Sequence, residues 1–171
     1  MALRIAIDGY NLIGASSGIG LHVPDIEQAR EELIERLITY KRLKGLSITV
    51  VFDGIRSGYL SRNQEVREGV KVIYSRHGEE ADYVLKQMVA EQGSGLTIVT
   101  SDRDIARFVE DKSAVVIPSS EFAELLAQCE LMDTKGGDGD DDDYDDGRQK
   151  KGPAFRASKK DRKKKQRIKK L

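Results

Sequence analysis

The sequence predicts an α/β protein of three layers, in which helices cover both faces of a mostly parallel sheet of about five strands. Short apolar runs alternate along the chain with longer segments whose apolar residues recur at helical spacing, which is typical of strand–helix–strand units. The apolar runs show little polar alternation, as expected of strands that are buried on both faces. Several runs end directly in an acidic residue, so acids are expected to collect at one edge of the sheet.

The first half of the chain is expected to supply two strands and one long helix. Residues 3–7 form a compact apolar run, and residues 47–52 form a second one. Between them, a Gly/Ser-rich loop is expected over residues 12–24. Asp25 is a suitable N-cap for the helix that follows, and Gly45 is a suitable stop for it.

The second half is expected to continue the alternation. Residues 54–68 are polar and irregular, which favours a flexible loop. Apolar runs predict three more strands, over residues 70–74, 96–99 and 114–117. Helical spacing predicts three more helices, over residues 79–91, 104–110 and 119–130. No internal repeat is visible, so residues 1–132 are expected to form one domain.

The chain from residue 133 onward has a different composition. An acidic block over residues 140–146 is followed by a Lys/Arg-dense block over residues 148–170 with few large apolar side chains. Such a segment buries too little apolar surface to offset its ordering entropy. Residues 133–171 are therefore expected to form a disordered tail.

The composition also predicts where the protein resides. The single cysteine, Cys129, rules out an internal disulfide framework, suits a reducing cytosol and is expected to pack in the core. No apolar run approaches the roughly 18 residues that a membrane span needs, and the N-terminus has no signal pattern. We expect a soluble, cytoplasmic protein with no membrane partner.

Acidic residues are the candidates for a catalytic site: Asp8, Asp53, Asp82, Asp102 and Asp104. Each has an ordinary explanation by itself, as a turn residue, a helix cap or a solvated residue in the first turn of a helix. Together they map to one edge of one sheet, where carboxylates repel one another unless a cation is bound. Mg²⁺ or Mn²⁺ prefers such oxygen ligands, whereas the chain has no Cys/His spacing for zinc.

Four motifs follow one another in the chain: Asp8-Gly9-Tyr10-Asn11, Val51-Phe52-Asp53, the acidic helix opening at residues 79–82, and Thr100-Ser101-Asp102-Arg103-Asp104. This ordered set resembles the NYN domains, which are PIN-like nucleases, and in particular their YacP-like bacterial branch. The resemblance covers residues 3–130. It implies a Rossmann-like PIN/NYN fold and a metal-dependent endoribonuclease with Mg²⁺ or Mn²⁺ as its cofactor.

The resemblance also implies roles for individual residues. The metal-binding acids of the family match three carboxylates of this chain: Asp8, Asp82 and Asp102. Asn11 matches the amide that supports the first acid or touches phosphate, and Asp53 and Asp104 fit as additional catalytic residues. Either Glu79 or Glu80 would join the site. Metal ions held there would neutralise the phosphate, activate a water and stabilise the leaving oxygen.

Basic residues are candidates for binding RNA. They are Arg56, Arg62 and Arg67 in the segment 54–68, and Lys163, Lys164 and Lys165 in the tail. The arginines would form a basic flap over the site, and the lysines would hold RNA or the ribosome through phosphate contacts. Each group has a plainer alternative as a solvated, solubilising surface.

Other functions remain open at this point. An RNA-binding NYN module without useful catalysis would have the same fold, although the chain keeps every acid that the resemblance requires. An assembly role in translation is a third possibility, and both a monomer and a homodimer are compatible with the sequence. The Gly-rich residues 14–20 are similar to a dinucleotide fingerprint, but they lie inside an expected loop and not between a strand and a helix, so dinucleotide binding is rejected.

Overall fold

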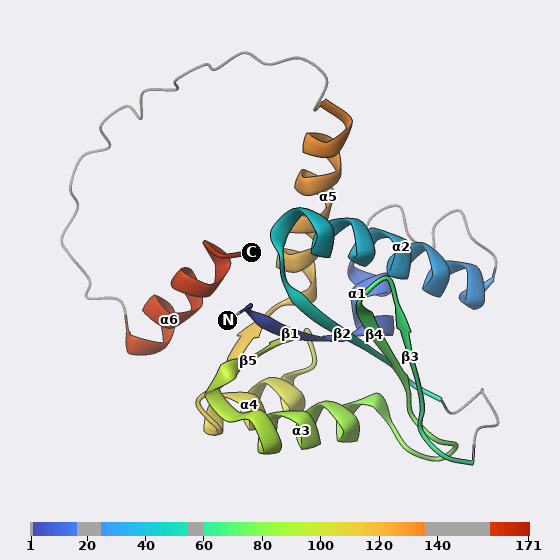
Figure 1. The fold of residues 1–171 in the computed structure, drawn as a ribbon. Helices are drawn as coiled ribbons and strands as arrows, with labels where there is room; N and C mark the ends of the chain where they lie inside the picture. Colours follow the sequence, from blue (N-terminus) through green and yellow to red (C-terminus); the bar gives the residue numbers. More distant parts are fainter. Residues whose placement is uncertain (1, 17–24, 55–59, 136–157) are drawn as a thin grey trace, which may run out of the picture.

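The computed structural model describes residues 2–16, 25–54, 60–135 and 158–171, and Figure 1 shows their fold. Six strands form one sheet in the order β3-β4-β2-β1-β5-β6. They are β1 (Arg4–Asp8), β2 (Ser47–Phe52), β3 (Asn63–Arg67), β4 (Val70–Tyr74), β5 (Leu96–Val99) and β6 (Val115–Ile117). All neighbouring strands run parallel except β3, which is antiparallel to β4.

Helices cover both faces of this sheet (Figure 1). They are α1 (Gly9–Ala15), α2 (Ile26–Lys44), α3 (Ala81–Gln92), α4 (Arg103–Asp111), α5 (Ser119–Lys135) and α6 (Lys159–Ile168), with a short 3-10 helix η1 at Gly93–Gly95. One hydrophobic cluster joins α1, α2 and α5 to the sheet through residues such as Leu12, Leu37 and Phe122. A second cluster joins α3 and α4 through Leu85 and Ile105. The predicted three-layer fold is confirmed.

β3 is the sixth strand, where the sequence predicts a flexible loop over residues 54–68. Its residues are mostly exposed, so it lacks the apolar pattern by which a strand is identified. A two-residue turn at Glu68 and Gly69 joins it to β4, with positive φ angles of 46° and 84°. This is the geometry of a tight hairpin turn, which favours glycine, so the turn is the local signal for the strand. Residues 55–59 lie outside the described part of the chain.

α1 corrects the expectation of a loop over residues 12–24. Asp8 caps the helix by accepting the N–H of Asn11, and Leu12 is fully buried in the core. The Gly-rich stretch therefore begins inside a helix. Residues 17–24 are not among those that the structure describes.

Two elements extend beyond the domain boundary predicted at residue 132. α5 continues to Lys135, and α6 occupies residues for which the sequence predicts disorder. Residues 136–157 between these helices lie outside the described part of the chain. The expectation of a disordered tail over residues 133–171 is therefore corrected for residues 133–135, which belong to α5, and for residues 159–168, which form α6.

α6 is capped by residues at its own start and is held on the domain by two apolar side chains and by polar contacts. Ser158 and Asp161 form a capping box at its start. Ile168 and Leu171 pack on the hydrophobic cluster of α1, α2 and α5, and Leu171 is only 3% exposed. The carbonyl oxygen of Leu171 accepts the Tyr40 hydroxyl at 2.5 Å. A few anchoring contacts thus order a segment whose average composition predicts disorder.

The sequence also predicts that Cys129 packs in the core and that no segment spans a membrane. Cys129 is a free cysteine that packs in the core, as predicted. None of the helices in the described residues combines the length and the apolar composition that crossing a bilayer requires.

Gly9 is required by a close approach to Phe52 and not by a positive φ angle. A Cβ at Gly9 would lie 2.5 Å from Cδ1 and 3.0 Å from Cζ of the fully buried Phe52 ring. We expect Gly9→Ala to lower the free energy of unfolding by about 1–3 kcal/mol, because the ring must move within a packed core.

The matched control for this substitution is Gly14→Ala in the same helix. Gly14 has no atom within 4 Å of the place where its Cβ would be, so alanine there should be neutral or slightly stabilising. Urea unfolding followed by circular dichroism compares the two variants. Equal stability of both would contradict the packing argument.

Candidate active site

The candidate site lies at the point where the order of the strands in the sheet reverses. β2 and β4 lie on one side of β1, and β5 and β6 lie on the other, so the chain leaves the centre of the sheet in opposite directions. Ligands of open α/β sheets bind at such a switch point, outside the carboxyl ends of the strands. Asp8 is the last residue of β1, and residues 100–102 directly follow β5. These two strand ends form the candidate site.

Asp8 is half-buried and caps α1. Its Oδ1 accepts the Asn11 N–H at 3.4 Å, and its Oδ2 accepts the Thr100 hydroxyl at 3.5 Å. The pKa of Asp8 is raised from 3.8 to about 6, first by burial and then by the carboxylates of Asp102 and Asp82, while these two hydrogen bonds act in the opposite direction. The three acids are therefore close enough to interact through their charges.

Asp102 caps α4 next to Thr100. Its Oδ1 accepts the backbone N–H of Asp104 at 2.8 Å and that of Ile105 at 3.1 Å. Its own N–H donates to the hydroxyl oxygen of Thr100 at 3.1 Å. Because the same hydroxyl donates to Asp8, Thr100 links the two acids.

Asn11 joins three elements around the site. Its Oδ1 accepts the backbone N–H of Ser101 at 2.8 Å and the hydroxyl of Ser119 at 2.5 Å. The N–H of Ser119 in turn donates to Oγ of Ser101 at 3.0 Å. The amide oxygen of Asn11 therefore fixes the turn that carries Asp102 against α1 and the start of α5. The sequence predicts that this amide supports the first acid or touches phosphate, whereas its described side-chain contacts lie at the turn of the second acid.

Asp82 stands in the first turn of α3 and is the third member of the acidic group. Its Oδ2 lies 3.1 Å from the ammonium of Lys86, one helical turn later. Its Oδ1 is buried and has no hydrogen-bond partner in the described part of the chain. A buried carboxylate oxygen without a partner is unfavourable, and a bound cation would satisfy it.

The chemistry of the acidic group fits a hard divalent cation. Asp8, Asp82 and Asp102 offer only oxygen ligands, which suits Mg²⁺ or Mn²⁺. Among the residues that the structure describes, no three His, Cys, Asp or Glu side chains gather closely enough to form a complete cage. A cation would therefore be held by some of these acids together with water or substrate oxygens, which is usual for Mg²⁺.

Asp53 and Asp104 lie at the same edge of the sheet. Asp53 follows β2 directly and is half-buried, whereas Asp104 is exposed in the first turn of α4. Asp104 also donates its backbone N–H to Asp102. Both positions are compatible with a supporting role beside the three acids.

Arg62 and Glu79 form an ion pair near this edge. Nε and Nη2 of Arg62 lie 2.9 and 2.7 Å from the two carboxylate oxygens of Glu79, which is 8% exposed. The hydrogen bond from Arg62 is the main reason that the pKa of Glu79 lies below its usual value. The Glu79 carboxylate is therefore occupied by contacts that stabilise the segment before α3. Glu80 is exposed at the N-cap of α3 and makes no side-chain capping bond.

We expect Glu79→Gln to destabilise the protein at neutral pH and to have less effect in acid. Because the folded-state pKa of Glu79 is lower than 4.5, the stability from this pair is present above that pH and is lost as the pH falls through the folded pKa. The loss at neutral pH should be about 1–2 kcal/mol. Denaturant titrations over a pH series measure the difference. Glu80→Gln is the control, and a pH-independent effect of Glu79→Gln would contradict the prediction.

The described arginines of the expected flap are bound to protein carboxylates. Arg67 lies beside Val70, the first residue of β4, and so stands at the opposite edge of the sheet from the acids. It pairs there with two glutamates of α2. Arg62 is held in the ion pair described above, and Arg56 lies outside the described residues. The structure therefore does not bring Arg62 and Arg67 together over the site.

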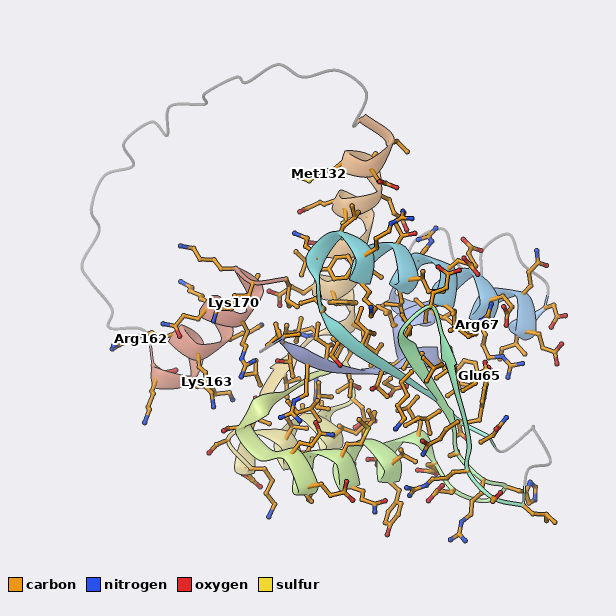
Figure 2. The ribbon with its side chains drawn as sticks, in the orientation of Figure 1. Glu65, Arg67, Met132, Arg162, Lys163 and Lys170 are labelled. Carbon is orange, nitrogen blue, oxygen red and sulfur yellow. The ribbon has the colours of Figure 1, made fainter. Side chains whose placement is uncertain are left out.

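The three predicted lysines lie on α6, which packs against β6. Lys163 donates to the carbonyl of Ser113 at 2.5 Å, Lys164 pairs with Glu121 at 2.9 Å, and Lys165 is exposed. Figure 2 shows Lys163 and Arg67 on opposite sides of the molecule. α6 thus places basic residues beside β6, the edge strand opposite to β3.

Three polar residues of the site are not predicted from the sequence: Thr100, Ser101 and Ser119. Thr100 and Ser101 belong to the motif that contains Asp102, so their position next to that acid in the sequence could have indicated that they belong to the site. Ser119 is fully buried and lies 108 residues from Asn11, and no local pattern indicates that contact.

Comparisons with known proteins identify the relatives of this chain. The profile of the family described as the YacP-like NYN domain matches residues 5–170. The uncharacterized protein YacP of Bacillus subtilis (strain 168) is 30% identical over 102 residues, which make up 57% of this chain and 59% of that protein. The match thus spans less than two thirds of the relative's own length.

Two solved structures of Rae1 (YacP) from Bacillus subtilis share the fold. A single-residue mutant matches with a TM-score of 0.63 and 23% identity, over 79% of this chain and 80% of that chain. A second structure of the same protein gives a TM-score of 0.63 and 22% identity, over 78% of each chain. At these identities the likeness shows the fold, and it agrees with the mostly parallel sheet and its flanking helices.

Proposed function

Because the chain belongs to the YacP-like NYN domain family, a family of RNA-related nucleases, we propose that it hydrolyses internal phosphodiester bonds of RNA with Mg²⁺ or Mn²⁺. The observation that carries this proposal is the acidic group at the switch point of the sheet. Burial and the charges of Asp102 and Asp82 together raise the pKa of Asp8 to about 6. Carboxyl groups gathered against their mutual repulsion are typical of functional sites.

The acidic group supplies the ligands that such a reaction needs. When bound, Mg²⁺ or Mn²⁺ would supply neutralisation of the phosphate charge and activation of a water for attack on phosphorus. Some of the carboxylates of Asp8, Asp82 and Asp102 would hold the ion, and water or substrate oxygens would complete its coordination. Asp53 and Asp104, at the same edge, would orient water or a second ion.

The protein itself contributes positioning. Thr100 holds Asp8 and the backbone of Asp102 in one hydrogen-bonded unit. Asn11 fixes the turn after β5 against α1 and α5. The acids therefore stand on the ends of rigid elements and not on free loops, which favours a preorganised site.

A second candidate function is an RNA-binding NYN module without useful catalysis. The ion pair between Lys86 and Oδ2 of Asp82 favours it, because a lysine that neutralises one acid weakens the site for a cation. In that case the protein would bind RNA, free or on the ribosome, without cleaving it.

RNA cleavage in the presence of Mn²⁺ tests the proposed function. Asp102→Asn should reduce the rate at least about 100-fold, because the loss of a metal ligand removes several kcal/mol of transition-state stabilisation. Asp111→Asn, which removes the same charge from the exposed end of α4, is the control and should cleave like the wild type. Equal cleavage by all three proteins would overturn the proposal, and RNA binding without any cleavage would support the second candidate.

A further inference from the structure

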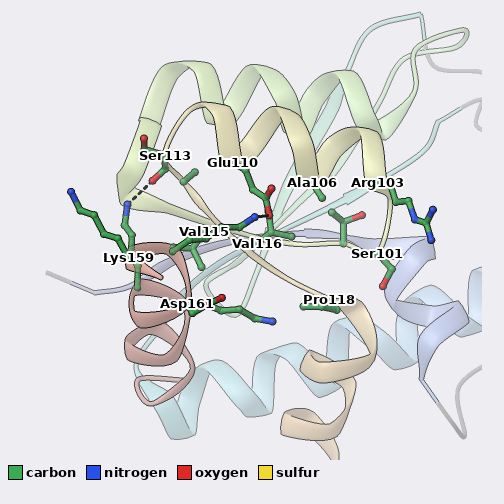
Figure 3. Close-up of a pocket in the computed structure, with 15 residues that line it drawn as sticks. Ser101, Arg103, Ala106, Glu110, Ser113, Val115, Val116, Pro118, Lys159 and Asp161 are labelled. Carbon is green, nitrogen blue, oxygen red and sulfur yellow. Dashed lines mark hydrogen bonds and ion pairs between the residues drawn. The ribbon is translucent and has the colours of Figure 1, made fainter. Parts of the chain in front are cut away.

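A pocket of about 720 Å³ lies between α4, β6, the start of α5 and α6 (Figure 3). This volume is within the range of sites that hold small ligands. Thr100 and Ser101, in the turn that carries Asp102, line one part of the pocket. Lys159 and Lys163, on the first turns of α6, line another. The pocket therefore connects the acidic site to the basic helix.

The floor of the pocket is apolar. Ala106 on the exposed side of α4, Val116 on β6 and Pro118 before α5 contribute to it. Ala106 and Val116 are only partly buried, so their side chains are accessible to a ligand. A flat apolar group such as a nucleobase finds a matching surface there.

The rest of the lining is rich in positive charge. Five lining residues are cationic and two are acidic: Arg103, Lys159, Lys160, Lys163 and Lys164 against Glu110 and Asp161. Lys160 is paired with Glu110 at 2.6 Å and Lys164 with Glu121 at 2.9 Å, which leaves Arg103, Lys159 and Lys163 against Asp161. The remaining excess of positive charge is complementary to a phosphate group.

We propose that this pocket binds a nucleotide of single-stranded RNA next to the phosphate that is cleaved. A nucleotide combines a flat base with an anionic phosphate, and the pocket offers an apolar floor and a cationic lining for these two parts. Thr100 and Ser101 line the pocket, and Thr100 is hydrogen-bonded to Asp8 and to the backbone of Asp102, so the pocket adjoins the turn that carries the second acid. The docked α6 then completes the binding site. This inference rests on the proposed function, since it takes the acidic group as the place of cleavage.

RNA binding by the full chain in EDTA tests the pocket without cleavage. The probe is a fluorescein-labelled single-stranded RNA of about 12 nucleotides, and its fluorescence anisotropy gives the affinity at several salt concentrations. The double variant Arg103→Ala/Lys159→Ala removes two cations from the pocket. We expect it to bind roughly tenfold more weakly and with a flatter salt dependence.

The matched control removes the same charge beside the pocket. Arg107 and Lys112 are exposed cations of α4 and of its C-cap, and neither lines the pocket. Arg107→Ala/Lys112→Ala should bind within about twofold of the wild type. Equal weakening by both double variants would show a general charge effect and overturn the proposal.

Ala106→Trp tests the floor without changing any charge. The indole would fill the pocket, so RNA affinity should fall several-fold while the melting temperature stays close to that of the wild type. Wild-type affinity in this variant would also overturn the proposal. Cleavage is measured separately with Mn²⁺. If the pocket variants lose affinity but the wild type never cleaves RNA, the pocket is supported and the proposed function fails. If the wild type cleaves RNA and the pocket variants bind it normally, the proposed function is supported and the pocket proposal fails.

Discussion

Asp8→Asn is expected to slow RNA cleavage strongly and, in the absence of metal, to make the protein more stable above pH 6. The amide keeps the cap of α1, because its oxygen still accepts the Asn11 N–H. It removes the charge that burial disfavours. Since a metal ligand is lost, the rate should fall at least about 100-fold.

The direction of the stability change follows from proton binding. The pKa of Asp8 is about 6 in the folded protein against an ordinary value of 3.8, so the folded state holds this proton more tightly than the unfolded chain. The stability of the wild type therefore falls as the pH rises from 3.8 to about 6 and stays lower above it. The whole effect is at most about 3 kcal/mol. Asp8→Asn has no carboxyl group at this position, so its stability does not fall in this way as the pH rises.

Urea unfolding at about pH 5 and about pH 8, in EDTA and in Mg²⁺, measures both parts of this prediction. In EDTA the stability of the variant relative to that of the wild type should increase from the lower to the higher pH. Mg²⁺ should stabilise the wild type and leave the variant nearly unchanged. Asp25→Asn, at the exposed N-cap of α2, is the control. A variant less stable than the wild type at high pH, or one that still cleaves, would contradict the assignment of Asp8.

Asn11→Ala is expected to cause the largest loss of stability among the site variants. It leaves the N–H of Ser101 and the buried hydroxyl of Ser119 without their acceptor. The buried hydroxyl without a partner costs about 1–3 kcal/mol and the exposed N–H costs less, so a total of about 2–3 kcal/mol is expected. The turn that carries Asp102 also loses its support, and cleavage by the folded fraction should fall about 10–100-fold.

Ser119→Ala separates these two effects, because it removes one hydrogen bond and keeps the contact between Asn11 and Ser101. It should lower stability by about 1 kcal/mol and cleave nearly as fast as the wild type. Single-turnover cleavage at a temperature where all variants are folded gives the rates, and denaturant unfolding gives the stabilities. If Asn11→Ala loses stability but keeps its rate, Asn11 supports the fold and does not position the acids.

Local patterns are enough to predict the parts of the site that lie at strand ends. Asp8 and Asp102 each follow a buried apolar run, and parallel strands bring such ends to one edge. Asp82 was predicted in the first turn of a helix and lies there. The strands of the core are likewise visible as apolar runs, which is why the fold class follows from the sequence.

Contacts between distant segments are not visible in such patterns. The ion pair of Arg62 with Glu79 turns two candidate site residues into structural ones, and only the fold brings them together. β3 is an exposed edge strand, so it has no apolar face to reveal it. α6 is missed for a different reason. Its average composition predicts disorder, while its docking depends on a few specific contacts, among them the packing of Ile168 and Leu171 and the ion pairs of Lys160 and Lys164.

The two edges of the sheet differ in how they are shielded from other molecules. β3 is exposed and carries Glu65 and Arg67, and charged edge strands resist pairing with a neighbour (Figure 2). β6 is short and apolar, and α6 packs against it. Trimming the charged tail back to the end of α5, a natural choice for crystallisation, would uncover Val115–Ile117 and invite edge-to-edge aggregation. α6, the most hydrophilic of the described helices, would thus also keep copies of the protein apart in concentrated solution.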